Sequence, residues 1–277
     1  MGNTPLISQL IDGSPRIHFS KLGSGPPLIF LHGIGGNRTN WNAQQLAMAD
    51  TCTTIAWDAR GYGKSDDYEG PLNFSDFSED LRRLLNFIKI EKAHFVGLSM
   101  GARILMDFYP RNVERVATLT LCDCFFSYKK ALSPEKQREF IRLRQKPLLA
   151  GKSLSEIAPT LIESLVGPNC TDQARNQLYK SILDIHVDSY LKTIEASTTF
   201  NAKGSLSNFS VPVQLIFGEH DKLTPPSIGE SMVSLLPDAN LDIILDSGHL
   251  SNIEQPEDFN KIMRKFIERY QDQACFS

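Results

Sequence analysis

The chain has 277 residues, of which 41% are hydrophobic, enough for two average domains or for one large α/β core with an insertion. Its 29 basic and 32 acidic side chains give a formal charge of -3 and are spread without basic blocks, which argues against nucleic acid or an anionic membrane as a partner. The chain has no stretch of about 18 apolar residues, and Met1 to Pro5 lack the charged and apolar regions of a secretory leader, so we expect a cytoplasmic protein without a membrane span.

The first half of the chain predicts a hairpin followed by alternating strands and helices. Two short strand-like runs, residues 6–11 and 16–20, flank the turn signal Asp12-Gly13-Ser14-Pro15. Apolar strand-like segments then alternate with amphipathic helical ones: the expected strands are residues 28–32, 53–57, 93–98 and 116–122, and the expected helices are residues 41–48 and 75–89. Alternation of this kind predicts an α/β fold with a mostly parallel, doubly wound sheet.

Residues 124–206 show a different pattern, with helices and no intervening strands. Ser133-Pro134-Glu135 predicts a helix start, and Ser153-Leu154-Ser155-Glu156 matches a capping box. The apolar stripes of these helices need a partner, and ligands of open α/β folds bind at the carboxyl edge of the sheet. We therefore expect a core of residues 1–123 and 207–277, and a helical cap, or lid, of residues 124–206 over that edge.

One serine lies between two glycines in Gly97-Leu98-Ser99-Met100-Gly101, after a predicted strand and before a run of helix-forming residues. This context matches a nucleophile elbow, a sharp turn in which flanking glycines avoid a Cβ clash. A serine hydroxyl is a weak nucleophile at neutral pH and needs an imidazole base oriented by a carboxylate. Ser99 is therefore the candidate nucleophile.

Two late strand-like runs, residues 213–217 and 241–245, are each followed by polar residues that suit the two partner roles. Asp221 comes after the first run, and His249 comes after the second. The order serine, acid, histidine along the chain is that of an α/β-hydrolase triad. Asp123 also follows a predicted strand, so it stays open as an alternative acid.

The proposed nucleophile also requires an oxyanion hole, made of backbone N–H groups near the point of attack. We assign one donor to the Met100 amide and the other to Ile34, in the glycine-rich turn after the strand of residues 28–32. His32, next to this turn, is expected to brace it. The candidate lining of the substrate pocket is Trp41, Leu98, Phe125 and Phe126.

Over nearly all of its length the sequence resembles the α/β-hydrolase superfamily. Asp58-Ala59-Arg60-Gly61-Tyr62-Gly63-Lys64-Ser65 is similar to its DxRGxGxS turn. The elbow, together with residues 119–122 and 249–257, resembles the 3-oxoadipate enol-lactonase and small carboxylesterase group. The resemblance implies an α/β-hydrolase fold with an inserted helical cap. It also implies hydrolysis of a small ester or lactone substrate through an acyl-enzyme on Ser99.

Other functions stay open on the same residues. One alternative is a C–C bond hydrolase or a perhydrolase, although C–C hydrolases often have Trp after the catalytic histidine, where this chain has Leu250. Another is a ligand-binding receptor of this fold, in which the triad binds or slowly cleaves a small ligand. The five cysteines lack the spacing of zinc or redox sites, and the expected chemistry needs no metal or other cofactor.

Overall fold

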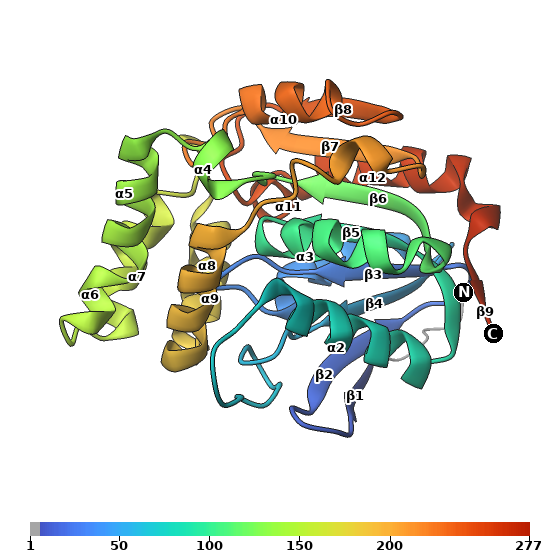
Figure 1. Cartoon of the computed structure of the whole chain (residues 1–277), viewed down its shortest axis with the longest axis horizontal. Helices are drawn as coiled ribbons and strands as arrows, with labels where there is room; N and C mark the ends of the chain where they lie inside the picture. Colours follow the sequence, from blue (N-terminus) through green and yellow to red (C-terminus); the bar gives the residue numbers. More distant parts are fainter. Residues whose placement is uncertain (1–5) are drawn as a thin grey trace.

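The structure is a computed structural model that describes residues 6–277, so the prediction made from residues 1–5 lies outside the described part. In this part nine strands form one sheet in the order β1-β2-β4-β3-β5-β6-β7-β8, and β9 pairs with β5 (Figure 1). The strands are β1 (Ile7–Ile11), β2 (Ile17–Leu22), β3 (Pro27–Leu31), β4 (Thr53–Trp57), β5 (Ile90–Leu98), β6 (Val116–Cys122), β7 (Val213–Gly218), β8 (Ala239–Ile244) and β9 (Cys275–Phe276).

The sheet is parallel from β4 through β8, and β1 and β2 extend it as an antiparallel hairpin. Both features confirm the predictions from the sequence. β3, β4, β6 and β7 are buried at every position, as expected for parallel strands covered on both faces. The sequence did not predict β9, because two residues carry no periodicity; β9 pairs with the start of β5, which begins three residues earlier than expected.

Helices cover both faces of the sheet. One face carries α2 (Phe74–Phe87), α3 (Met100–Phe108) and α10 (Pro226–Val233), and the other carries α1 (Asn42–Met48) and α12 (Pro256–Arg269). The short α11 (Ser251–Glu254) precedes α12. A 3-10 helix, η1 (Arg38–Trp41), precedes α1. As predicted, Phe77, Leu81, Leu84 and Leu85 form the buried side of α2. The sequence pattern thus gives the correct orientation of this helix.

Residues 124–206, called the helical segment below, lie beyond one end of the sheet, at the left of Figure 1. They form α4 (Tyr128–Ala131), α5 (Pro134–Arg144), α6 (Lys146–Leu149), α7 (Leu154–Glu163), α8 (Asp172–Leu183) and α9 (Val187–Thr199). Ser133 caps α5, and the predicted capping box of Ser153 and Glu156 starts α7. A β-bridge between Ser127 and Asn201 joins the two ends of the segment.

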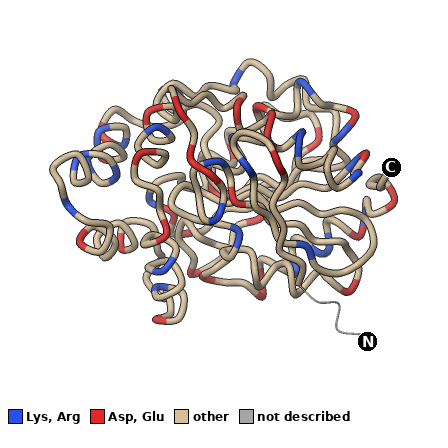
Figure 2. The backbone as a smooth tube through the Cα atoms, turned by 90° about the horizontal axis from the view of Figure 1, so that it is seen from below, with Lys and Arg blue, Asp and Glu red and all other residues tan. Residues whose placement is uncertain are grey.

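Acidic and basic residues alternate over the chain without a large region of one sign (Figure 2). This distribution agrees with the absence of basic blocks in the sequence. Among residues 6–277, no helix has both the length and the apolar content that crossing a bilayer requires.

Candidate active site

Ser99 occupies the turn between β5 and α3 with φ 52° and ψ -104°, a conformation that is unfavourable for a side chain other than glycine. The two flanking glycines make the turn possible. A Cβ on Gly97 would lie 2.5 Å from the amide nitrogen of Ala102, and a Cβ on Gly101 would overlap the carbonyl oxygen of Leu31. The start of α3 therefore packs directly on the backbone of β3, and the serine side chain is raised above the end of the sheet.

The loops after β5, β7 and β8 bring Ser99, Asp221 and His249 together, as the order of the strands predicts. The Nε2 atom of His249 lies 3.0 Å from the Oγ of Ser99, and its Nδ1 atom lies 2.7 Å from Oδ2 of Asp221. All three residues are buried, with exposed fractions of 8% or less. A carboxylate only accepts, so Nδ1 carries the proton in the neutral imidazole and the Nε2 lone pair faces the serine hydroxyl.

The carboxylate of Asp221 is held by its own loop. Oδ1 accepts hydrogen bonds of 2.8 Å from the amides of Leu223 and Thr224, and Oδ2 accepts from the hydroxyl of Thr224 as well as from His249. Burial alone would raise the pKa of Asp221, but the charge of His249 and these hydrogen bonds hold it below the ordinary value. The carboxylate therefore stays ionised next to the imidazole.

The alternative acid, Asp123, lies at the end of β6 and points elsewhere. Within residues 6–277 its side chain has two hydrogen-bond partners, the Gly218 amide at 2.7 Å and the Ser251 hydroxyl, and neither is His249. Burial and the nearby charge of Asp221 raise the pKa of Asp123 well above the ordinary value. Through these two hydrogen bonds the side chain joins β6 to β7 and α11.

The loop that carries His249 is fixed by a residue that the sequence analysis did not single out. The buried Glu254 accepts hydrogen bonds from the amides of Gly248 at 3.1 Å, Leu250 at 3.2 Å and Gly167 at 2.7 Å. Burial raises the pKa of Glu254 despite these donors. Glu254 lies within residues 249–257, which carry the family resemblance, and this resemblance is the sequence feature that could have indicated its role.

The expected oxyanion donors, Ile34 and Met100, lie on either side of Ser99. Met100 is the first residue of α3, and Ile34 follows β3 in the loop of residues 33–36, called the oxyanion loop below. Within the described residues, neither amide donates a hydrogen bond to a protein acceptor. Both N–H groups are thus available to a ligand.

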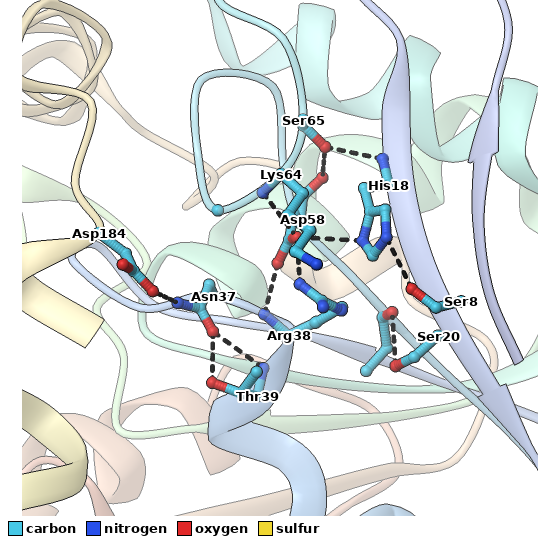
Figure 3. A network of polar contacts seen from close by, with 12 residues as sticks. Ser8, His18, Ser20, Asn37, Arg38, Thr39, Asp58, Lys64, Ser65 and Asp184 are labelled. Carbon is cyan, nitrogen blue, oxygen red and sulfur yellow. Dashed lines mark hydrogen bonds and ion pairs between the residues drawn. The ribbon is translucent and has the colours of Figure 1, made fainter. Parts of the chain in front are cut away.

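Asp58, the first residue of the DxRGxGxS turn, anchors the chain just after the oxyanion loop. Its carboxylate accepts hydrogen bonds of 2.7 Å from both the amide and the guanidinium of Arg38, and one of 3.0 Å from the Lys64 amide (Figure 3). Burial alone would raise the pKa of Asp58, but its contacts with His18 and Arg38 hold it below the ordinary value.

His32 braces the oxyanion loop from inside, as expected. Its Nδ1 donates to the carbonyl of Gly33 at 2.8 Å, and its Nε2 accepts from the amide of Ala59 at 3.1 Å. Burial lowers the pKa of His32, so the ring is neutral at physiological pH. His32 and Asp58 together tie the oxyanion loop to the DxRGxGxS turn.

A second row of serine, histidine and aspartate lies in the same network but differs from the first. The Oγ of Ser8 lies 2.8 Å from Nε2 of His18, whose Nδ1 is 3.3 Å from Oδ2 of Asp58 (Figure 3). Ser8 lies in regular antiparallel pairing on the edge strand, and the Asp58 carboxylate is already neutralised by Arg38. This row therefore lacks both the elbow and the free carboxylate of a nucleophilic site.

Ser99 and His249 line a narrow cavity of about 40 Å³ between the core and the helical segment. The amide of His249 donates to the carbonyl of Leu165 at 2.7 Å, so the helical segment contacts the histidine loop directly. From the helical segment, the cavity is lined by Phe140, Arg144, Leu161, Ile162, Leu178 and Ile182.

Of the four residues predicted to line the pocket, Trp41 and Leu98 lie at the cavity and the two phenylalanines do not. Phe125 packs instead on the guanidinium of Arg103, 4.5 Å from the ring centre, and edge-on against Tyr128. Phe126 is buried beside it in the same core cluster. Because the chain turns sharply at the end of β6, both rings enter the packing between the sheet and the helical segment rather than the cavity.

Several known proteins are similar to this chain in sequence or in fold. A family model described as alpha/beta hydrolase fold matches residues 26–256. The sequence is 26% identical over 248 residues to 3-oxoadipate enol-lactonase 1 of Acinetobacter baylyi, covering 90% of this chain and 91% of that protein. A thermophilic esterase from Thermogutta terrifontis has a TM-score of 0.85 at 24% identity, covering 96% of this chain and 99% of its own. The enol-lactonase from Burkholderia xenovorans has a TM-score of 0.81 at 21% identity, and the match covers 92% of this chain and 97% of that protein.

Proposed function

The chain belongs to the α/β hydrolase family, and from this membership we propose that it is a serine hydrolase that cleaves a small carboxylic ester or lactone. The observation that carries the proposal is the row of contacts from Ser99 through His249 to Asp221, with distances of 3.0 Å and 2.7 Å. The relatives named as an enol-lactonase and an esterase support ester hydrolysis as the class of reaction.

In the first half of the proposed reaction, Nε2 of His249 takes the proton of Ser99 while Oγ attacks the substrate carbonyl. The carboxylate of Asp221 stabilises the imidazolium that forms. The amides of Ile34 and Met100 donate to the developing oxyanion, where preorganised donors are worth most.

In the second half, the tetrahedral intermediate collapses, and His249 returns the proton to the leaving alkoxide. The acyl group stays on Ser99 as an ester; for a lactone, the alkoxide remains tethered to it. His249 then deprotonates a water molecule that attacks the acyl-enzyme, and the proton passes back to the serine when the carboxylic acid leaves.

We assign the helical segment the role of a cap over a core of residues 1–123 and 207–277. Its side chains supply much of the cavity lining, and its Leu165 carbonyl accepts from the His249 amide. Such a cover excludes water from the acyl-enzyme until hydrolysis and admits only a small substrate.

A fluorophosphonate probe followed by mass spectrometry of the adduct tests the proposed nucleophile, and a panel of small esters and lactones tests the reaction. The variant Ser99→Ala should lose the label and lower kcat by roughly 10⁴-fold or more. Ser231→Ala is the matched control, because that exposed hydroxyl bonds only to the carbonyl of Ser227 within α10. Labelling of the Ser99→Ala protein at the wild-type rate would refute the assignment.

The same measurements separate the alternative functions. A C–C bond hydrolase would turn over a vinylogous diketone faster than any ester, and a perhydrolase would form peracid from a carboxylic acid and peroxide. A receptor would complete a single turnover and retain the product. Steady multiple turnover of an ester or lactone is the expected result.

A further inference from the structure

Arg144, the last residue of α5, is a buried cation in the cavity that holds Ser99 and His249. Its exposed fraction is 5%. Within residues 6–277, its guanidinium has neither a hydrogen bond nor an ion pair, and no other lysine or arginine lines this cavity. A fixed positive charge is therefore present in the cavity of the proposed nucleophile, without a carboxylate bound to it in the described part of the chain.

A buried charge without a partner is unfavourable, because it has lost its hydration without gaining a replacement. Burial lowers the pKa of the Arg144 guanidinium, but arginine stays protonated in proteins. The ring of Phe140 lies 4.8 Å from its Cζ and offers a cation–π contact, which leaves the five N–H donors unsatisfied. The donors of Arg144 are thus available to a ligand.

The acidic groups near Arg144 have other hydrogen-bond partners. Asp221 accepts from His249, and Glu139 is bound by the exposed Arg142 at 2.6 Å. These two charges raise the pKa of Arg144, as do the neighbouring Tyr128 and Tyr190, but none of the four donates to or accepts from its guanidinium. These acidic groups therefore act on Arg144 from a distance, and none of them hydrogen-bonds its guanidinium.

A second buried guanidinium adds to the positive charge of this region. Arg103, in α3, is 1% exposed, stacks on Phe125 and has a weak bond of 3.4 Å to the carbonyl oxygen of Ser99. In the described part of the chain its Nη1 has no hydrogen-bond partner, and Arg144 repels it. Over residues 6–277, neither guanidinium is hydrogen-bonded to a carboxylate, which favours a ligand that brings a negative charge.

On the basis of the proposed function, we propose that the substrate is an ester or lactone that also carries a carboxylate, and that Arg144 binds this carboxylate. The planar guanidinium matches a carboxylate with two parallel hydrogen bonds, and its burial in a cavity lined mostly by apolar side chains strengthens them. Arg144 is thereby the residue that selects anionic substrates, while Ser99 attacks the ester carbonyl.

The test compares anionic substrates with neutral ones of the same shape. In the first pair, monoethyl glutarate carries a carboxylate on its acyl side, and ethyl 5-oxohexanoate has a methyl ketone in its place. In the second pair, 3-acetoxypropanoate carries the carboxylate on its alcohol side, and 3-oxobutyl acetate is the neutral counterpart. We expect the wild-type enzyme to have the higher kcat/KM for the anionic member of at least one pair, chiefly through a lower KM.

The variant Arg144→Met removes the charge and keeps the length of the side chain. It should lower kcat/KM for the preferred anionic substrate by roughly 10- to 100-fold, the effect of losing a hydrogen-bonded charge, and leave the neutral partner within about threefold. Arg144→Lys should retain part of the preference. Arg142→Met is the matched control, because Arg142 lies on the same helix but is 59% exposed and away from the cavity, and it should behave like the wild type.

The outcomes separate the two proposals. If no ester or lactone is hydrolysed, the proposed function fails. If neutral esters are hydrolysed and neither anionic substrate is preferred, the assignment of Arg144 fails while hydrolysis stands. Glutarate inhibition of neutral-ester hydrolysis gives a second readout: it should be competitive in the wild type and weaker in Arg144→Lys. Equal inhibition of both proteins would overturn the assignment even if Arg144→Met does not fold.

Discussion

Replacing Asp221 by Asn removes one charge at the centre of the site and tests the whole contact row. The amides of Leu223 and Thr224 donate to Oδ1 of Asp221, so the carbonyl oxygen of an asparagine must stay at that position. Its NH₂ group then faces Nδ1 of His249, where Oδ2 lies in the wild type. Two donors cannot face each other, so the imidazole must place its proton on Nε2.

An imidazole with its proton on Nε2 donates toward the hydroxyl of Ser99 and cannot accept its proton. The loss expected for the wrong tautomer is on the order of 10⁴-fold in kcat, by analogy with the same substitution in other triads. This factor corresponds to about 5.5 kcal/mol of transition-state stabilisation. KM should change little, because the interaction forms in the transition state.

Asp123→Asn is the matched control, because it makes the same change at the other buried aspartate. The carbonyl oxygen of an asparagine can still accept from the Gly218 amide, and its NH₂ group can donate to the Ser251 hydroxyl, which accepts as well as donates. We expect kcat within a few fold of the wild type. Steady-state kinetics on one activated ester, with thermal unfolding as a check on folding, compare both variants. Activity of Asp221→Asn within about tenfold of the wild type, or a larger loss in Asp123→Asn, would refute the reasoning.

Three further predictions concern the frame of the site. Gly101→Ala should lower the free energy of unfolding by about 3 kcal/mol or more, because the new Cβ overlaps the Leu31 carbonyl. Gly204→Ala is the control, because no other part of the described chain lies within 4 Å of the added Cβ, and calorimetry should show no such loss for it. Because the pKa of Asp123 is raised in the folded state, this group contributes stability below the ordinary carboxyl pKa, and the contribution is lost as pH rises through the folded pKa. Asparagine does not titrate, so Asp123→Asn avoids this loss. The melting temperature of the variant minus that of the wild type should therefore increase with pH. In Glu254→Gln the carbonyl oxygen can keep the amides of Gly248 and Leu250, so the NH₂ group must face the Gly167 amide. We expect lower stability and kcat, with faster hydrogen exchange at Gly167 and in the His249 loop; unchanged exchange there would contradict this role.

Local sequence was sufficient to predict the fold, Ser99 and His249, and to reduce the acid of the contact row to Asp221 or Asp123. Ser99, Asp221 and His249 each follow a recognisable strand, and the carboxyl ends of parallel strands share one edge of a sheet. Gly97 and Gly101 were recognisable for a similar reason. A Cβ on Gly97 would clash with the elbow itself, and a Cβ on Gly101 would clash with the adjacent strand β3. Features that depend on one element and its nearest neighbour leave a pattern in the chain.

Tertiary structure decided what depends on the docking of distant elements. Asp123 and Asp221 both end predicted strands, and only the loop geometry shows that Asp221 meets the imidazole. Phe125 was expected at the cavity but packs on Arg103, because the chain turns away after β6. Arg144 ends a polar helix and has the sequence pattern of a solvated charge, but the packing of α5 over the sheet buries it beside the nucleophile. Burial arises from the surfaces that meet, and no single segment of the chain encodes which surfaces those are.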